Sequence, residues 1–239
     1  MNSPIKIGNV EWNNNDIINE IDNFLKIYDN RPIKTNKGGM SSIHCFATFF
    51  ILKKINKAFI VESGVWKGQS TYLIEKTCPN SELMCIEPTP SRILYKSKNA
   101  KYTINDFSML NIINPTDTIC FFDDHQNAVN RIKQAVQKGI KNLIFEDNYP
   151  VGQGDCISLK QTLELNNEDS KYIREHIKIY YEFPPLFIKE YTRWNTKWNL
   201  YPTKQPIFNE VNNELITKKY NIFHEDATDY TWISYVELK

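Results

Sequence analysis

Acidic residues stand at the ends of successive short apolar segments in this 239-residue chain. Glu62, Glu87 and Asp106 follow the first three segments. Asp123 begins an Asp-Asp-His group after the fourth segment, and Glu146 begins a Glu-Asp pair after the fifth. If the segments are parallel strands, their carboxyl ends meet at one edge of the sheet, where ligands bind in open α/β folds. The spacing therefore predicts one acidic ligand site.

The segments alternate with helical patterns from Ala58 onward, and this alternation is typical of a mostly parallel sheet with helices on both faces. The expected strands are Phe59–Glu62, Leu83–Glu87, Tyr102–Ile104, Thr118–Phe122 and Asn142–Phe145. The expected helices are Ser70–Lys76, Pro90–Lys98 and Asn127–Lys138, the last with Gly139 as its C-terminal cap. The fold class is therefore α/β and Rossmann-like.

Two regions flank this core. Apolar residues at helical spacing predict a helix from Asp16 to Tyr28, and a second helix begins near Ser41 or Ser42 after a polar loop. We expect residues 1–57 to form a helical cover that makes a single compact unit with a catalytic domain of residues 58–239.

The pattern is less regular after Asn148. Helices are expected at Ser158–Leu165 and Lys171–Tyr181. Two β-rich runs, Tyr220–Phe223 and Trp232–Leu238, predict a terminal hairpin that completes the sheet.

The composition excludes several classes of protein. Lys and Arg number 29 against 28 Asp and Glu, a net charge of +1, so no global charge favours nucleic acid or an anionic membrane. No segment has the roughly 20 apolar residues that a membrane helix needs. The five cysteines form no Cys-x-x-Cys pair, and the N-terminus has no apolar signal core. We expect a cytoplasmic protein with reduced thiols.

A glycine-bearing turn links the first strand to its helix. Gly64 and Gly68 allow a tight turn and close approach of the backbone to a ligand, and the following helix begins with free amides. Trp66 occupies the place of the middle glycine in the dinucleotide fingerprint, so an ordinary strand-to-helix turn is the alternative.

The next two strand ends favour a nucleoside. Glu87 lies 25 residues after Glu62, where an acid can accept hydrogen bonds from both ribose hydroxyls. Asp106 can accept from an exocyclic amine, with Phe107 beside it to cover a purine face. A helix cap at Glu87 and a simple turn at Asp106 are the alternatives. The acid at Glu62 disfavours a diphosphate, so an adenosine with a cationic tail fits better than NAD.

The fourth and fifth strand ends predict a metal site. Asp123, Asp124 and His125 should lie beside Glu146 and Asp147, and clustered carboxylates repel one another unless a cation or proton neutralises them. An oxygen-rich set with a single histidine favours Mg²⁺ or Ca²⁺ over structural zinc. For His125, a polar position at a helix start is the alternative.

The sequence from Glu62 to Gly68 resembles the glycine motif of class I S-adenosylmethionine (SAM) methyltransferases, and its Gly-Val-Trp-basic-Gly form resembles the macrocin O-methyltransferase and cephalosporin-hydroxylase-like group. The resemblance covers about residues 58–155 and implies a seven-stranded sheet whose last strand is antiparallel. It places SAM across the carboxyl ends of the first strands. The cofactor residues that it implies are Glu62 and Gly64 at the methionine part, Glu87 at the ribose, Asp106 and Phe107 at the adenine, and Trp66, Gly68, Ser70 and Thr71 around the turn.

The same resemblance implies a divalent ion, Mg²⁺ or another, held by Asp123, Glu146 and Asp147. Asp123 would also accept the proton of the acceptor. The family motif is commonly Asp-x-Asp, whereas this chain has Asp123-Asp124-His125, so the ligand is either Asp123 or Asp124 and His125 is a candidate base. The implied activity is O-methylation of a hydroxyl on a sugar, nucleotide sugar or glycosylated small molecule.

Two other functions fit the same sequence. One is a hydroxylase-like or diverged metal enzyme on this fold, and the other is a non-catalytic SAM-binding or assembly protein. Several segments have two interpretations each. The loop with Arg31, Lys34 and Lys37 either binds an acceptor phosphate or is simply solvated. An aromatic segment either stacks on a sugar or forms a flap or a contact within a homo-oligomer. Its aromatic residues are Tyr191, Trp194, Trp198 and Tyr201.

Overall fold

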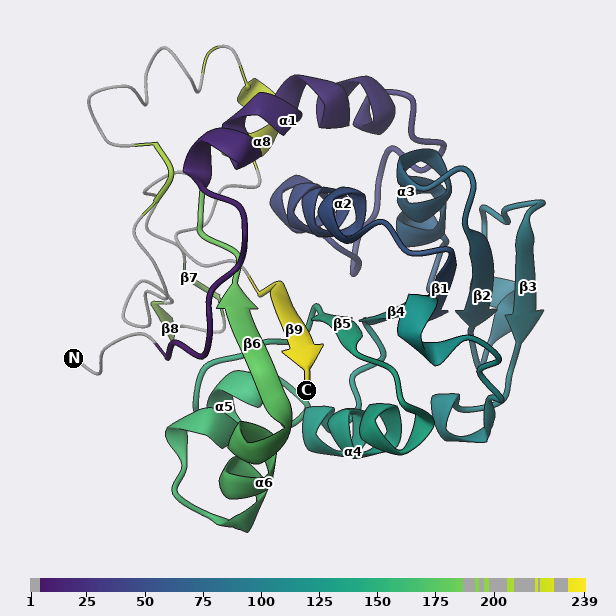
Figure 1. The fold of residues 1–239 in the computed structure, drawn as a ribbon. Helices are drawn as coiled ribbons and strands as arrows, with labels where there is room; N and C mark the ends of the chain where they lie inside the picture. The colour runs from purple at the N-terminus through teal and green to yellow at the C-terminus, as the bar shows by residue number, and fades with distance from the viewer. Residues whose placement is uncertain are drawn as a thin grey trace.

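A computed structural model describes residues 5–186, 192–193, 196–197, 206–208, 218, 220–225 and 232–239. At its centre lies a seven-stranded sheet in the order β3-β2-β1-β4-β5-β9-β6 (Figure 1). The strands are β1 Phe59–Ser63, β2 Glu82–Ile86, β3 Ala100–Thr103, β4 Thr118–Phe122, β5 Asn142–Phe145, β6 Ile177–Glu182 and β9 Ser234–Leu238. Strand β9 is antiparallel to both neighbours, and β1 to β5 are parallel. The predicted fold class, including the antiparallel last strand, is confirmed.

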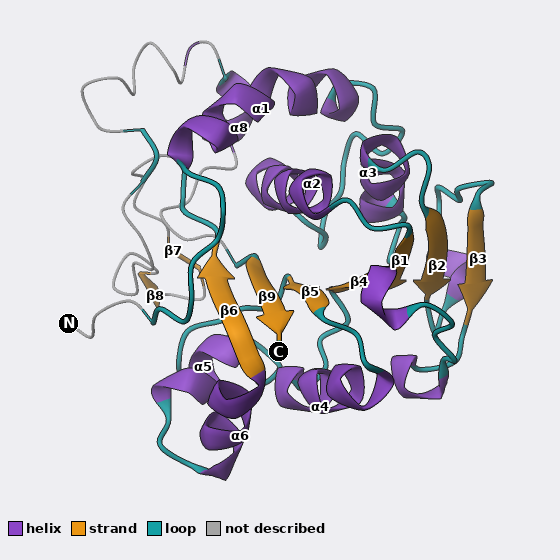
Figure 2. Ribbon diagram, in the orientation of Figure 1, coloured by secondary structure: helices purple, strands orange, loops and turns teal. Residues whose placement is uncertain are grey.

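Helices cover both faces of this sheet (Figure 2). One face carries α1 Asn14–Tyr28, α2 Ser42–Ile55 and α3 Gln69–Thr77, and the other carries α4 Ala128–Lys138, α5 Leu159–Glu164 and α6 Glu168–His176. The remaining described elements are α8 Asn221–Glu225 and a small pair of strands, β7 Thr192–Arg193 and β8 Thr196–Lys197. The described helices include none long and apolar enough to cross a membrane.

Two hydrophobic cores follow from the alternation of side chains along each strand. Ile60 belongs to the core under α1, α2 and α3, whereas the next residue, Val61, belongs to the core under α4, α5 and α6. Phe121 and Phe122 on β4 divide in the same way. Successive residues of a strand point to opposite faces, so a strand buried on both faces must be apolar throughout.

Local signals set several helix boundaries. Asn13 caps α1 in a capping box with Asp16, and Asn127 caps α4 by accepting from two backbone amides. Gly139 ends α4 with φ +74°, a conformation that favours glycine. These three ends lie within two residues of their predicted positions.

Three sequence predictions are wrong. The expected helix Pro90–Lys98 is only the 3-10 turn Pro90–Arg92. The backbone amides of Leu94 and Tyr95 both donate to the carbonyl of Lys67 at 3.0 Å, which ties this segment to the glycine turn. Tertiary hydrogen bonds therefore replace those of a helix.

The other two errors concern the end of the sheet. The expected helix Lys171–Tyr181 ends at His176, where β6 begins, because the following alternation of Ile177 and Ile179 suits a strand paired with β9. Tyr220–Phe223 is not a strand, and most of it lies in α8. The antiparallel partner of β9 at this end is therefore β6.

Aromatic packing joins the N-terminal helices to the rest of the chain. Phe24 of α1 is fully buried, and its ring contacts those of Tyr28, Phe46, Phe49 and Phe223, with centroids 5.0–5.6 Å apart. Such clusters stabilise a fold through buried area and through ring–ring contacts.

We propose that residues 1–57 are an integral part of one folded unit, and Phe24→Ala tests this. Removing the ring leaves a cavity, which should lower the free energy of unfolding by about 3–5 kcal/mol in urea denaturation of the whole chain. The exposed Asn19→Ala on the same helix is the control and should change little. A Phe24→Ala protein as stable as wild type would contradict the proposal.

Candidate active site

A cavity of about 590 Å³ opens at the carboxyl ends of β1, β2 and β4. Its walls come from the loops that follow these strands, from the loop before α2 and from α4. The lining residues are Gly38, Gly39, Ser63, Gly64, Trp66, Ile86, Glu87, Pro88, Arg92, Ile104, Asp106, Asp123, Asp124, His125, Gln126 and Arg131. Residues predicted for a nucleoside and residues predicted for a cation therefore line one cavity, as the spacing of the acids predicts.

The glycines of the turn after β1 are required by close backbone contacts. Gly64 has φ +93°, and a Cβ there would collide with the backbone carbonyl of Asp123. Gly68 has φ +94°, and a Cβ there would collide with the carbonyl of Tyr95. Any larger residue would push the turn away from the loops that follow β4 and β2.

Glu87 organises this turn from the neighbouring strand. Its two carboxylate oxygens accept from the backbone amides of Trp66 at 2.9 Å and Thr89 at 2.8 Å. Trp66 itself has φ +53°, and its ring lies 5.2 Å from the guanidinium of Arg92. The structure thus brings Glu87 and Trp66 together in the cavity wall.

Glu62 lies behind the wall. It is fully buried, and one carboxylate oxygen accepts from Thr71 at 2.6 Å and from Cys85 at 3.2 Å. The other oxygen has no partner among the described residues. Burial raises the pKa of Glu62 above its ordinary value. Thr71 therefore supports this carboxylate, and neither Ser70 nor Thr71 lines the cavity.

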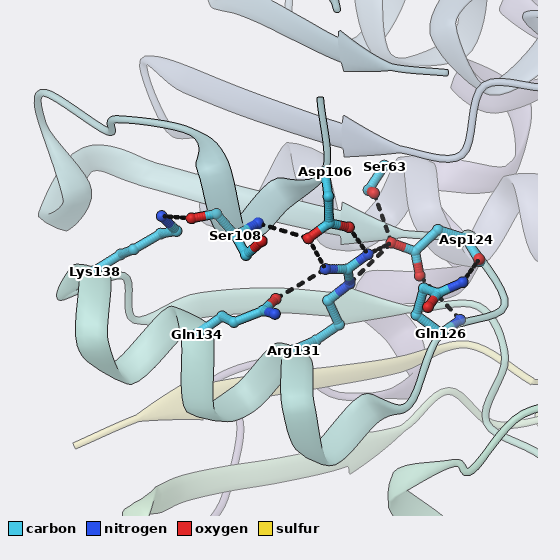
Figure 3. A network of polar contacts seen from close by, with 8 residues as sticks. All are labelled: Ser63, Asp106, Ser108, Asp124, Gln126, Arg131, Gln134 and Lys138. Atoms are coloured by element: carbon cyan, nitrogen blue, oxygen red, sulfur yellow. Dashed lines mark hydrogen bonds and ion pairs between the residues drawn. The ribbon is translucent and has the colours of Figure 1, made fainter. Parts of the chain in front are cut away.

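Arg131 of α4 connects two acids that the sequence assigns to different sites (Figure 3). Its guanidinium lies 2.7 Å from Asp106 and 2.8 Å from Asp124, and Asp124 also accepts from Ser63 at 2.6 Å. Hydrogen bonds from Arg131 hold the pKa of Asp106 well below its ordinary value. Asp124 therefore takes part in an ion-pair network, which leaves Asp123 as the free candidate of the two.

Phe107 does not reach the cavity. Its side chain is fully buried and packs edge-on against Phe122, with ring centroids 5.0 Å apart. The expectation that Phe107 covers a purine face is therefore wrong for this structure, because the 3-10 turn that starts here directs the ring into the core. Ile104, 65% exposed, lines the cavity at this end instead.

A second cluster lies across the cavity, after β4 and β5. Asp123, His125 and Asp147 offer ligand atoms that all lie within 4.8 Å of one another. Burial and repulsion from Glu146 and Asp147 raise the pKa of Asp123 well above its ordinary value. Burial and the charge of Glu146 raise the pKa of Asp147 to about 7. These carboxyl groups are close enough to disfavour full ionisation without a cation.

His125 lies between acids from two segments. Its Nδ1 lies 3.0 Å from Asp155 and 3.3 Å from Asp147, and its backbone amide donates to Asp147 at 3.0 Å. Burial lowers the pKa of His125, but these two carboxylates outweigh burial and raise it. The residue has φ +52°, so its backbone occupies a region that few side chains adopt.

Glu146 makes a different contact from the one expected. Its Oε1 lies 3.1 Å from Nδ1 of His44, a buried residue of α2, and Glu146 is not part of the 4.8 Å cluster. The structure therefore brings together Asp123 and Asp147, as predicted, and adds His125 where Glu146 was expected. Glu146 still acts on this cluster through its charge.

The sequence gives a signal for one of the missed residues and none for the others. Arg131 is a buried cation on the apolar face of α4, where Ala128, Ile132 and Ala135 are buried too, so its position requires a buried anion. His44 and Tyr149 contact the acids after β5 from positions that no local pattern links to them.

The mostly parallel seven-stranded sheet with antiparallel β9, together with the glycine turn after β1, is a Rossmann-like α/β fold. No protein-family model matches the chain, and no curated protein matches its sequence.

Solved structures give low similarities. One of CmcI with SAH is 17% identical over 64% of this chain and 86% of its own, with a TM-score of 0.41. A CmcI structure with Mg and SAM is 24% identical over 42% of this chain and 50% of its own, with a TM-score of 0.34. A SAM-dependent O-methyltransferase from Thermotoga maritima is 11% identical over 93% of this chain and 71% of its own, with a TM-score of 0.48. The roles of individual residues here must follow from the geometry of the site.

The Arg131 network should make stability depend on acid pH. An unfolded aspartate titrates near pH 4, and the pKa of Asp106 is lower in the folded protein, so its stabilisation is present above about pH 4 and is lost below it. Asp106→Asn should therefore flatten the fall in unfolding free energy between about pH 5 and pH 2, measured by urea denaturation. The exposed Asp29→Asn is the control. If the unfolding free energies of wild type and Asp106→Asn fell equally between about pH 5 and pH 2, the pairing of Asp106 with Arg131 would be contradicted.

Proposed function

We propose that this protein transfers the methyl group of SAM to a hydroxyl group of a small molecule, with the help of a divalent cation. The observation that carries this proposal is the single cavity lined both by Glu87, which suits a ribose, and by Asp123 and His125, which suit a cation and a proton transfer. Methyl donor and acceptor must meet within one enclosed space, because the transfer needs the reacting atoms in line and in contact.

Three observations support SAM as the cofactor. The turn through Gly64 and Trp66 lines the cavity, and its close approach to the carbonyl of Asp123 requires the glycine. One buried oxygen of Glu62 lacks a partner among the described residues, and the ammonium group at the methionine end of SAM would supply a donor. Glu62 does not line the cavity, so this contact requires the turn in front of it to move. Among the described residues, Glu87 accepts two backbone hydrogen bonds, from Trp66 and Thr89, and it retains acceptor capacity toward the cavity. In this proposal Glu62 and Gly64 serve the methionine part and Glu87 the ribose.

The adenine end of the site is less polar. Asp106 lines the cavity, and Ile104 exposes apolar surface near it. Since Asp106 is held by Arg131, its carboxylate is fixed before any ligand binds, which suits an acceptor for an exocyclic amine.

The cation site fits a hard divalent metal. Asp123 and Asp147 supply carboxylate oxygens, and His125 supplies a nitrogen within the same 4.8 Å cluster. Mg²⁺ prefers carboxylates, and a histidine ligand also suits transition metals such as Mn²⁺. We propose Asp123 and Asp147 as ligands, with His125 or Glu146 as the third protein group.

A bound divalent cation lowers the pKa of a hydroxyl that it contacts and fixes the position of its oxygen. In the reaction, the acceptor oxygen forms a bond to the methyl carbon, the carbon–sulfur bond breaks, and its electron pair stays on sulfur as S-adenosylhomocysteine forms. The hydroxyl proton passes to Asp123 or His125, both of which line the cavity.

For the acceptor, we propose a hydroxyl of a sugar, nucleotide sugar or glycosylated small molecule, on the strength of the sequence resemblance. A hydroxylase-like activity on the same fold is the second candidate. The mass of the product separates the two, because methylation adds a methylene unit to the acceptor and hydroxylation adds an oxygen atom.

Glu87→Ala should abolish detectable SAM binding in isothermal titration, because the change removes the ribose acceptor and frees the amide of Trp66. Glu82→Ala is the matched control, since Glu82 lies exposed at the opposite end of β2. SAM binding by the Glu87→Ala protein at wild-type affinity would contradict this assignment, and a wild type that does not bind SAM would contradict the proposed function itself.

EDTA should abolish methyl transfer to a responsive acceptor while leaving most of the SAM affinity, because the cation acts on the acceptor oxygen and Glu87 holds the cofactor. Activity should return when Mg²⁺ or Mn²⁺ is added in excess. Transfer that continues at the same rate in EDTA would refute the metal-assisted mechanism and leave cofactor binding to be judged by titration.

A further inference from the structure

The two consecutive acids after β5 are each held by a side chain outside the cation cluster. Oε1 of Glu146 lies 3.1 Å from Nδ1 of His44, and both side chains are under a tenth exposed. The hydroxyl of Tyr149 donates to Oδ1 of Asp147 at 2.9 Å, and this bond is buried. Each acid therefore has one oxygen engaged by a neutral or cationic donor.

Both donors pack against the same indole ring. The ring of Trp232 lies 5.0 Å from that of His44 and 5.3 Å from that of Tyr149, measured between centroids. The backbone carbonyl of Trp232 also accepts from the amide of Asn148 at 3.1 Å. Trp232 thus contacts the segment after β5 through its backbone and both donors through its ring.

These contacts join parts of the chain that are far apart in sequence. His44 lies on α2, near the N-terminus, and Trp232 lies just before β9, near the C-terminus. Nothing in core packing alone requires a histidine with a carboxylate partner at this depth, because an apolar side chain would fill the space without burying a charge. A buried imidazole that orients a carboxylate is, however, a common support for a metal ligand.

We infer that His44, Tyr149 and Trp232 form a clamp that orients the carboxylates of Glu146 and Asp147 for a divalent cation, and so sets the affinity of the site for metal. The inference rests on the proposed function, because it assumes that these acids serve a cation. The three members are positioning residues: they act through Glu146 and Asp147.

The clamp can be tested without SAM or acceptor by titrating the full chain with Mn²⁺ and following free Mn²⁺ by electron paramagnetic resonance. His44→Ala removes the donor to Glu146 and should weaken Mn²⁺ binding by about 10- to 100-fold. His44→Asn keeps an N–H donor near the place of Nδ1 and should restore part of the affinity. Tyr149→Phe, which removes only the hydroxyl that binds Asp147, should weaken binding in the same direction.

His176→Asn is the matched control. His176 also donates through Nδ1, here to the backbone carbonyl of Tyr172, and stacks on the ring of Tyr172, but it lies at the end of α6. This variant should bind Mn²⁺ like wild type. The SAM affinity and melting temperature of His44→Asn should also match those of wild type, which separates a positioning role from a general structural one.

Wild-type Mn²⁺ affinity in both His44→Ala and Tyr149→Phe would overturn the clamp. So would a loss of affinity in His44→Ala that is matched by an equal loss in His176→Asn. If wild type binds SAM but not Mn²⁺, the clamp and the metal site are both refuted while cofactor binding stands. If wild type binds Mn²⁺ with the expected losses but not SAM, the clamp stands and the proposed methyl transfer does not.

Discussion

Repulsion between carboxylates is the constraint on which this structure depends. A parallel sheet brings the carboxyl ends of its strands to one edge, and in this chain the strands end in acids. Arg131 relieves part of the repulsion by pairing with Asp106 and Asp124. Asp123 and Asp147 have no arginine or lysine partner among the described side chains, although His125 lies 3.3 Å from Asp147. Burial and repulsion from neighbouring carboxylates raise the pKa values of both acids. The repulsion that destabilises these carboxylates in the absence of a cation favours the binding of a divalent cation between them.

One buried arginine therefore divides the acids into two functional groups. Arg131 pairs with Asp106 and Asp124 (Figure 3), whereas Asp123 and Asp147 lie in the candidate cation cluster. Asp123 and Asp124 are neighbours in sequence but belong to different groups, because Asp124 pairs with Arg131 and Asp123 lies in the candidate cation cluster. Breaking a buried pair of this kind leaves an uncompensated charge, which is far more costly than the pair is stabilising.

The prediction of secondary structure succeeded where the local pattern carried the information. The central strands are mostly apolar because both of their faces are buried, and the boundaries of α4 follow from Asn127 and Gly139. Prediction failed where distant contacts decided the conformation. The amides of Leu94 and Tyr95 bind the carbonyl of Lys67 in place of helical partners, and β6 is a strand because β9 returns beside it.

Side-chain periodicity and the backbone freedom of glycine, which are properties of neighbouring residues, predicted which acids follow which strands, the glycine turn after β1 and an α/β sheet. The antiparallel last strand came instead from the resemblance to a known family. Three arrangements depend on contacts between elements that are distant in sequence. They are the ion pair of Arg131 with Asp124, the contact of His44 with Glu146, and the burial of the Phe107 ring in the core. The physical reason is that charge pairing and burial depend on which elements meet in space, and a local pattern does not contain that information.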